Sequence, residues 1–241
     1  MRLSTRPRTI VLASSALAAA TTLTTLAATA DAGSRPPLSL VSATKDSVAP
    51  VTRYGSYLEF TQTGLYLATG SKPVEIWVSR KDYSSPVKAE VRIGKGKRPK
   101  VIKVPSGMAG LDGLKDFLQI KLVDAKGKTK LSYSSPYCGA GWYGDSVRLG
   151  PGAPESSPYP YSGCSAHPFS LSALYGFQSS TGNVLPIDTF GDEGNSLDTS
   201  QEALPDGTYT AKVSLGKKWR ELLGVSASQG TASVKIEIAT I

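Results

Sequence analysis

The 241-residue chain contains one histidine, His167, and only two cysteines, Cys138 and Cys164. A Ser-His-Asp triad would have to use His167, yet the chain has no G-x-S-x-G nucleophile motif. A zinc site with two or more Cys or His ligands is not available if the cysteines are paired, and no glycine-rich phosphate loop occurs. The sequence therefore predicts no catalytic residue, no cofactor and no metal ligand.

Glycoside hydrolysis by two carboxylates is a chemistry that these absences leave open. The candidate acids are Asp145, Glu155, Asp192, Glu193 and Asp198. Nothing in their spacing selects a pair, so a secreted carboxylate-dependent hydrolase stays as an alternative function.

After residue 32 the chain also lacks an apolar run of the roughly 18 residues that span a bilayer. The first 32 residues have the pattern of a secretory signal peptide. Three arginines precede an apolar stretch over residues 10–30, and Ala30-Asp31-Ala32 fits the small-x-small cleavage rule. We therefore expect a secreted protein, extracellular or cell-wall associated, with no membrane span and no nucleic-acid partner.

The two cysteines enclose a segment rich in glycine, proline and aromatic residues, which is typical of a loop. Because disulfides persist outside the cytosol, we expect a Cys138–Cys164 bridge, and closing such a loop stabilises a fold by about 3–4 kcal/mol. The aromatic side chains either pack on one another or form a contact surface for a sugar or a protein. The candidate contact residues are Trp142, Tyr143, Tyr159 and Tyr161.

Positive charge predominates, with 27 lysines and arginines against 19 acidic residues and a net charge of +8. The segment Lys72 to Lys130 alone holds 15 basic and 6 acidic residues. Within it, an expected hairpin tip carries the candidate residues for an anionic polymer such as teichoic acid or an acidic glycan: Lys95, Lys97, Arg98 and Lys100. The alternative interpretation is a solvated basic surface that keeps the protein soluble.

Alternation of hydrophobic and polar residues predicts short β-strands along most of the chain. They lie over residues 57–60, 65–67, 74–78, 87–93, 101–104, 118–122, 183–190 and 232–239, and the segment 204–214 opens with a turn and continues as a strand. Residues 217–223 predict a short helix, and Asp206-Gly207-Thr208-Tyr209 resembles the tyrosine corner of immunoglobulin-like sandwiches. We expect a mostly β protein: an antiparallel immunoglobulin-like β-sandwich of one or two units, with a disulfide-pinned irregular loop and one short helix near the C-terminus.

The pattern along the chain predicts five segments. They are a signal peptide (1–32), a linker (33–47), a first β-sandwich region (48–135), a disulfide and aromatic connector (136–180) and a C-terminal β region (181–241). The last region either completes the first sandwich or forms a second one.

Several short sequence segments of the chain resemble segments of a known group of proteins. They are Ser79-Arg-Lys-Asp-Tyr-Ser-Ser-Pro-Val87, Pro136-Tyr-Cys138, Ser156-Ser-Pro-Tyr-Pro160, His167-Pro-Phe-Ser-Leu171, Gly176-Phe-Gln178, Leu204-Pro-Asp-Gly-Thr-Tyr-Thr210 and Trp219-Arg-Glu-Leu-Leu-Gly224. Together they are similar to the N-terminal, non-catalytic region of secreted actinobacterial lysyl-oxidase-like proteins, over roughly residues 38 to 240. The copper site of that family needs closely spaced histidines, so the resemblance implies an accessory region without amine oxidase activity.

These observations together favour a secreted, non-catalytic binding or structural module of the bacterial envelope or extracellular matrix. Its expected partner is an anionic wall polymer or another secreted protein. There are two alternatives to such a module: an accessory protein related to lysyl oxidase, and the secreted carboxylate-dependent hydrolase.

Overall fold

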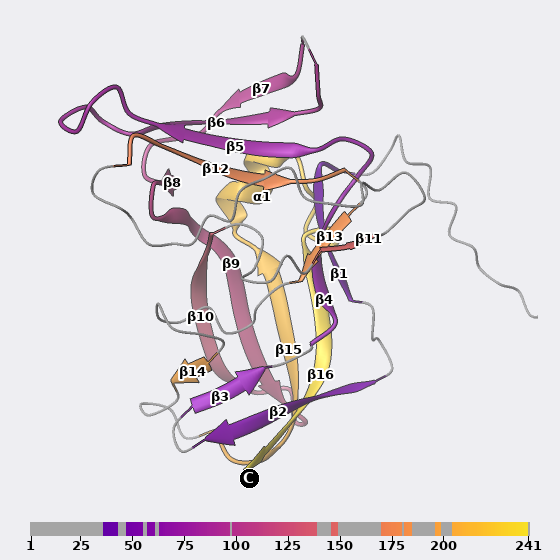
Figure 1. Cartoon of the computed structure of the whole chain (residues 1–241). Coiled ribbons are helices and arrows are strands. Elements are labelled where there is room, and N and C mark those ends of the chain that lie inside the picture. Colours follow the sequence, from indigo (N-terminus) through magenta and orange to yellow (C-terminus); the bar gives the residue numbers. More distant parts are fainter. Residues whose placement is uncertain are drawn as a thin grey trace, which may run out of the picture. The chain divides into compact units, whose positions relative to one another are not determined.

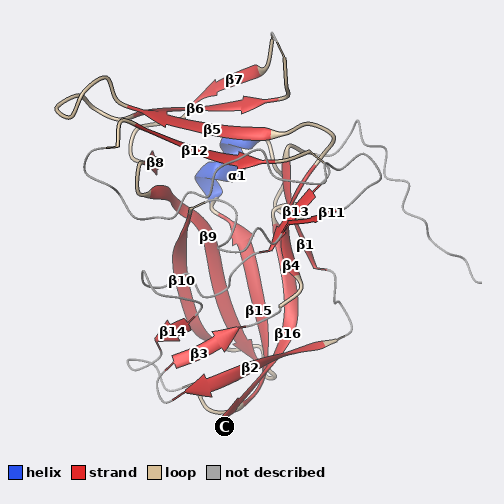
Figure 2. Cartoon of the chain, in the orientation of Figure 1, coloured by secondary structure: helices blue, strands red, loops and turns tan. Residues whose placement is uncertain are grey.

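Strands dominate the computed structural model of this chain, with one short helix near the C-terminus (Figure 2). The structure describes residues 36–42, 47–54, 57–60, 63–96, 98–138, 146–148, 170–179, 181–184, 196–198 and 204–240. All of these belong to one compact unit, residues 31–241. No helix in the described part of the chain has the length and apolar character needed to cross a membrane. The mostly β fold and the short helix are therefore confirmed.

The largest sheet has the strand order β10-β9-β15-β16-β2-β3-β14, and β8 pairs with β9 (Figure 1). Its strands are β2 (Val48–Tyr54), β3 (Tyr57–Phe60), β8 (Ala109–Gly110), β9 (Gly113–Asp124), β10 (Thr129–Tyr137), β14 (Ser196–Asp198), β15 (Gly207–Leu215) and β16 (Thr231–Thr240). The expectation of an antiparallel sheet is wrong at one place, because β16 and β2 pair in parallel. Alternation within a strand says which face is buried, but not in which direction the neighbouring strand runs.

Two smaller sheets complete the fold, and all of their strand pairs are antiparallel. The second sheet has the order β1-β4-β13-β11, formed by β1 (Leu38–Ser42), β4 (Leu65–Thr69), β13 (Thr181–Val184) and β11 (Ser146–Arg148). The third has the order β12-β5-β6-β7, formed by β12 (Ser172–Phe177), β5 (Val74–Ser79), β6 (Lys88–Ile93) and β7 (Lys100–Lys103). The helix α1 (Lys217–Leu223) connects β15 to β16.

The segment expected to be a linker, residues 33–47, instead contributes a strand to the second sheet. In β1, Leu38 and Leu40 are buried, and β1 pairs with β4 along its whole length. The Leu40 amide also donates a hydrogen bond to the Gln229 carbonyl, at 2.9 Å. The nearby prolines favoured a linker, but two leucines two positions apart are enough to bury one face of a short strand.

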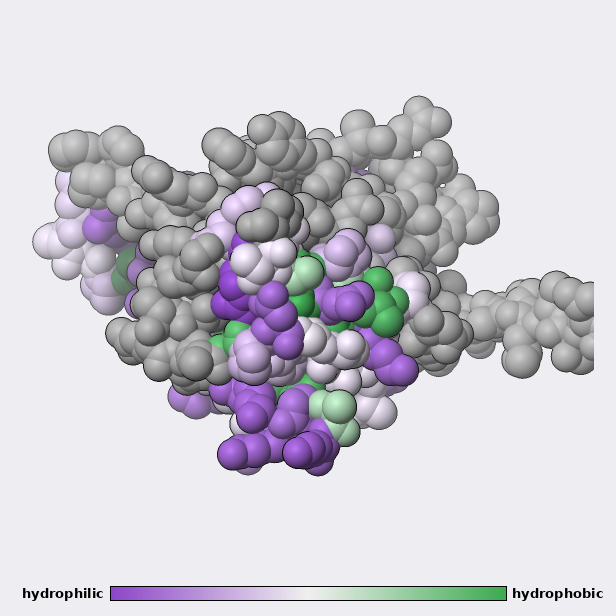
Figure 3. Space-filling model, turned by 90° about the horizontal axis from the view of Figure 1, so that it is seen from below, coloured by the Kyte–Doolittle hydropathy of each residue, from purple (hydrophilic) through white to green (hydrophobic). Residues whose placement is uncertain are grey.

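One hydrophobic core receives side chains from all three sheets, including Val51, Leu67, Ile76 and Leu118. The predicted alternation is seen most clearly in β5, β15 and β16, where every second residue is buried. Each fully buried aliphatic side chain stabilises the fold by about 1.5–3 kcal/mol. Seen from below the view of Figure 1, the described surface is largely hydrophilic, with small apolar areas between (Figure 3).

A cluster of four aromatic rings joins the third sheet and α1 to the largest sheet. The Phe117 ring of β9 lies 5.2 Å from the Tyr137 ring and 5.3 Å from the Trp219 ring, centroid to centroid. The Tyr137 ring in turn stacks on that of Phe177, at 5.4 Å. The Trp219 indole donates a hydrogen bond to the Lys115 carbonyl, at 2.9 Å, so the one polar atom of this ring has a partner.

Tyr175 provides a second link between the third sheet and the largest sheet. Its hydroxyl donates a hydrogen bond to the Gly110 carbonyl of β8, at 2.9 Å. Burial raises the pKa of Tyr175 to about 12, so this hydroxyl is protonated and can donate the hydrogen bond at neutral pH.

Gly216, at the start of α1, lies against the backbone of β9. Its amide donates to the Phe117 carbonyl at 2.8 Å, and a Cβ atom at this position would collide with the Asp116 carbonyl oxygen. Asp116 itself has a φ of 50°, a conformation uncommon for residues other than glycine. A side chain at residue 216 is therefore incompatible with the way α1 meets β9.

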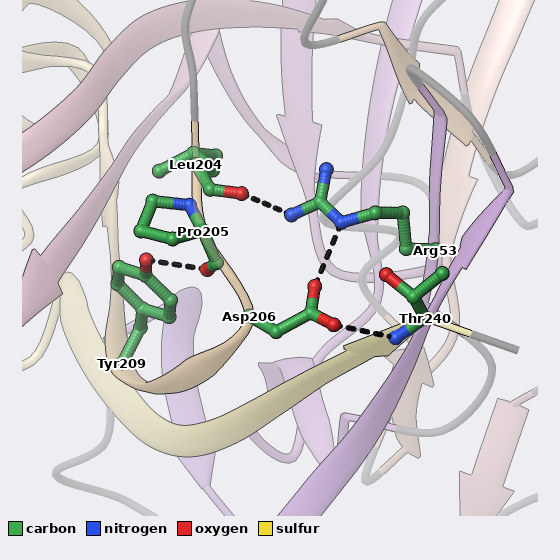
Figure 4. A network of polar contacts seen from close by, with 6 residues as sticks. All are labelled: Arg53, Leu204, Pro205, Asp206, Tyr209 and Thr240. Carbon is green, nitrogen blue, oxygen red and sulfur yellow. Dashed lines mark hydrogen bonds and ion pairs between the residues drawn. The ribbon is translucent and has the colours of Figure 1, made fainter.

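The polar network at residues 204–209 ties the start of β15 to β2 and β16 (Figure 4). The Tyr209 hydroxyl donates to the Pro205 carbonyl at 2.7 Å, which is the kind of bond to the nearby backbone that a tyrosine corner makes. Asp206 accepts hydrogen bonds from the Arg53 guanidinium and from the Thr240 amide, each at 2.9 Å. Arg53 also donates to the Leu204 carbonyl.

We predict that Gly216→Ala lowers the free energy of unfolding by about 1–3 kcal/mol, because the new methyl group forces β9 and α1 apart. Thermal and urea denaturation would measure this loss. Lys218→Ala, an exposed position of the same helix, is the control and should change stability little. Equal stability of Gly216→Ala and the native protein would contradict the contact.

The Asp206 network predicts an acid-sensitive contribution to stability. The hydrogen bond from Arg53, followed by those from Thr240, lowers the pKa of Asp206 below its ordinary value of 3.8. A carboxyl whose pKa is lower in the folded state stabilises the fold above its unfolded pKa, and this contribution is lost as the pH falls through the folded pKa. We expect Asp206→Asn to melt at a lower temperature than the native protein at pH 6.

The same variant should lose less of its melting temperature than the native protein between pH 6 and pH 3. Calorimetry at both pH values would measure the difference. Arg53→Gln is the companion variant, and it should flatten the acid dependence in the same direction, because it removes the largest cause of the pKa shift. Parallel pH profiles in all three proteins would contradict this role for Asp206.

Candidate anion-binding site

The predicted basic hairpin is formed by β6, a turn and β7. Ile93 pairs with Lys100 across its base, and Gly94 and Gly96 have φ angles of 97° and 94°, which few other residues adopt. Lys95, Arg98 and Lys100 are exposed, while Lys97 lies outside the described residues. Lys95 and Arg98 therefore lie on an exposed turn, and Lys100 begins β7 directly after it.

Two further cations lie beside this turn that the sequence pattern does not single out. The stem of Lys72 passes close to Gly94, because a Cβ atom at Gly94 would lie 3.8 Å from the Lys72 Cδ atom. Arg92 is on the outer face of β6, directly opposite Glu75 of β5. Arg92 lies near the turn because of the register between β5 and β6. Lys72 lies near the turn because it comes just before β5 in the chain.

A shallow groove of about 520 Å³ lies beside this turn on the third sheet. Its volume falls in the range of small-ligand sites. It is lined by Glu75, Arg92, Gly94, Lys95, Gly96, Pro99 and Leu174. Its charged residues are Glu75, Lys95 and Arg92, and Arg92 is ion-paired with Glu90. Lys95 is therefore the cation of this groove that has no ion-pair partner among the described residues.

Trp77 lies next to this groove on the outer face of β5, and 36% of its surface is exposed. Its indole N–H donates to a Glu75 carboxylate oxygen at 2.9 Å. The Arg92 guanidinium lies over the ring, 4.7 Å from its centroid, and also donates to Glu90 at 2.6 Å. These contacts hold one large apolar ring in a fixed orientation beside the cations.

The sequence alone already indicates that Trp77 faces solvent, although the strand prediction does not name it as a candidate binding residue. Because Val74, Ile76 and Val78 face the core, alternation places Trp77 on the solvent face of the same strand. A tryptophan among polar neighbours on a solvent face is a stronger indication of binding than an exposed aliphatic residue.

We define the hairpin site as the cations of this turn and its neighbours together with the exposed ring. Its members are Lys72, Trp77, Arg92, Lys95, Arg98 and Lys100. The arrangement offers charge for phosphate, sulfate or carboxylate groups and a flat apolar surface for the ring of a sugar.

A second and larger groove, of about 690 Å³, lies where α1 meets β9. It is lined by Ser106, Gly107, Met108, Lys115, Asp116, Gln119, Gly216, Lys217, Lys218 and Trp219. Lys115 and Lys217 form ion pairs with Asp112 and Glu221, at 3.5 and 3.9 Å. Two of the three lysines of this groove therefore already have anionic partners.

Most of the other candidate residues lie outside the described residues. This applies to Cys164, His167, Trp142, Tyr143, Tyr159 and Tyr161, and to the acids Asp145, Glu155, Asp192 and Glu193. Cys138 directly follows β10, and Asp198 ends β14. The disulfide, the aromatic contact surface and the carboxylate pair therefore stay predictions.

Comparisons with known proteins give no family to which these features can be assigned. No protein-family model, no curated protein and no solved structure matches the chain. The hairpin site is therefore interpreted from its own charges, contacts and exposure.

Proposed function

We propose that this chain is a non-catalytic binding module that attaches to anionic polymers of the bacterial envelope through the hairpin site. The observation that carries the proposal is the exposure of Lys95 and Arg98 on one turn and of Lys100 at the start of β7, with Lys72 beside them. Cations gathered on one surface raise the local concentration of a polyanion and speed its association.

The signal-like pattern of residues 1–32 supports a location outside the cytosol, where teichoic acids and acidic glycans are the abundant polyanions. The resemblance to the accessory region of lysyl-oxidase-like proteins supports the same non-catalytic role. Within the hairpin site, Glu75 and Glu90 are engaged with Trp77 and Arg92, so these carboxylates act in holding the site together.

Reversing the charge of the hairpin tests the proposal. We predict that Lys95→Glu combined with Lys100→Glu weakens retention on purified cell-wall sacculi about tenfold at low salt. Sacculi with and without teichoic acid, across a salt series, provide the measurement. The native protein should need the anionic polymer for retention, and its retention should fade as salt is added.

The matched control reverses two lysines on a different hairpin turn. Lys126 and Lys128 are exposed on the turn between β9 and β10, with Gly127 at a φ of 80° between them. The double variant Lys126→Glu and Lys128→Glu carries the same change in net charge and should keep most of the retention. If both double variants lose the same amount of retention, the loss is due to the change in net charge alone, and the proposal that the hairpin site binds the polymer is wrong.

Trp77 allows a prediction about the kind of polymer. Trp77→Ala should weaken binding to acidic polysaccharides severalfold, because the ring supplies apolar contact area for a sugar. Binding to inorganic polyphosphate, which has no sugar, should change much less. Titrations with hyaluronate and with polyphosphate would separate the two effects, and equal losses for both polymers would mean that Trp77 only supports the fold.

A further inference from the structure

A row of three lysines crosses the outer face of the largest sheet, separate from the hairpin site. Lys121 of β9 lies directly opposite Lys212 of β15. On the other side of β15, Lys212 pairs with Ser233, and Lys235 is the next residue of β16 on the same face. All three lysines are exposed. We name Lys121, Lys212 and Lys235 the lysine face.

The lysine face has no anionic partner within the described ranges of the chain. The carboxylates near it are engaged elsewhere or lie along the strand: Asp124 pairs with Lys130 at 3.5 Å, and Asp116 accepts a hydrogen bond from Ser134 at 2.7 Å. Glu237, two residues after Lys235, lies opposite Thr208 and forms no ion pair with any described residue.

This arrangement costs stability, because like charges directly opposite each other destabilise a sheet. Lysines on edge strands are common, since they block aggregation through the free edge. That explanation does not apply here, because β9, β15 and β16 are interior strands of the sheet. The fold therefore gains nothing from the pairing of Lys121 with Lys212, whereas a bound anion would turn the repulsion into attraction.

Hydroxyl groups surround the lysines on the same face. Ser132 of β10 lies opposite Lys121, Ser233 lies opposite Lys212, and Thr210 lies opposite Lys235. Serine and threonine hydroxyls donate hydrogen bonds to anionic oxygens. The face thus combines three lysine charges, three hydroxyl groups and the carboxylate of Glu237 on four neighbouring strands.

We propose that the lysine face binds a linear phosphate polymer that runs across β9, β15 and β16. The three cations named here are all lysines, whose ammonium groups act as point charges and can bind the oxygens of a phosphate in any orientation. A polymer with a phosphate in every unit engages several lysines at once, so that weak individual contacts add to useful affinity. This inference does not depend on the hairpin site.

Chemical labelling of the native protein tests the inference without any variant. Lysines are acetylated with and without poly(glycerol phosphate), and the modified residues are identified by mass spectrometry. We expect Lys121, Lys212 and Lys235 to be protected severalfold, whereas the exposed Lys81 is not. Protection by hyaluronate to the same degree, or unchanged labelling of the three lysines, would overturn the assignment to a phosphate polymer.

A charge-removing variant provides the second test. Lys121→Gln combined with Lys212→Gln should weaken poly(glycerol phosphate) binding about fivefold for each lysine removed. It should also raise the melting temperature by about 1–3 °C, because the repulsion is gone. Lys81→Gln is the control and should change neither value. An unchanged affinity, or a lower melting temperature, would overturn the inference.

The two binding surfaces are distinguished by using both sets of variants against the same polymer. Charge reversal at Lys95 and Lys100 should leave the protection of Lys121 and Lys212 in place. If that protection disappears with the hairpin variant, the lysine face has no affinity of its own and the inference fails. If protection persists while retention on sacculi is unaffected, the inference stands and the hairpin proposal fails.

Discussion

The contact of Phe117 with three other rings is the interaction on which the arrangement of this fold depends. Phe117 belongs to β9, and its partners Tyr137, Phe177 and Trp219 belong to β10, β12 and α1. One side chain thus joins two strands of the largest sheet, the third sheet and the helix. Gly216 allows this contact, because α1 can approach β9 closely only where no Cβ atom intervenes. The third sheet, and with it the hairpin site, is positioned by this cluster.

Strand geometry places both proposed binding surfaces opposite the core. In β5, Ile76 is buried while Trp77 faces solvent; in β15, Val213 is buried while Lys212 faces solvent. Successive residues of a strand point to opposite faces, so the same backbone that packs the core fixes the spacing of the outer side chains. The buried residues of each strand therefore fix the positions of the charged residues next to them, although they do not themselves contact a ligand.

The parts of the fold that the sequence could predict are those that depend on near neighbours. Strands with clear alternation, the helix at 217–223 and the bond from Tyr209 to the backbone all arise within a few residues, and the exposed turn at Lys95 to Lys100 belongs with them. Four features were not predictable from the sequence. They are the strand in residues 38–42, the parallel pair of β16 with β2, the approach of Arg92 to Trp77 and the lysine face. Each depends on the register between segments, which one strand's pattern does not determine.

The position of β16 has a consequence for how the chain acquires its structure during synthesis. β16 lies between β15 and β2 in the largest sheet, although β2 spans residues 48–54 and β16 spans residues 231–240. The hairpin of β2 and β3 has no partner on its β16 side until nearly the whole chain has left the ribosome. Contacts between such distant segments also form slowly. The largest sheet therefore cannot be completed until residues 231–240 have been synthesised, and the strands on the two sides of β16 are joined only at that point.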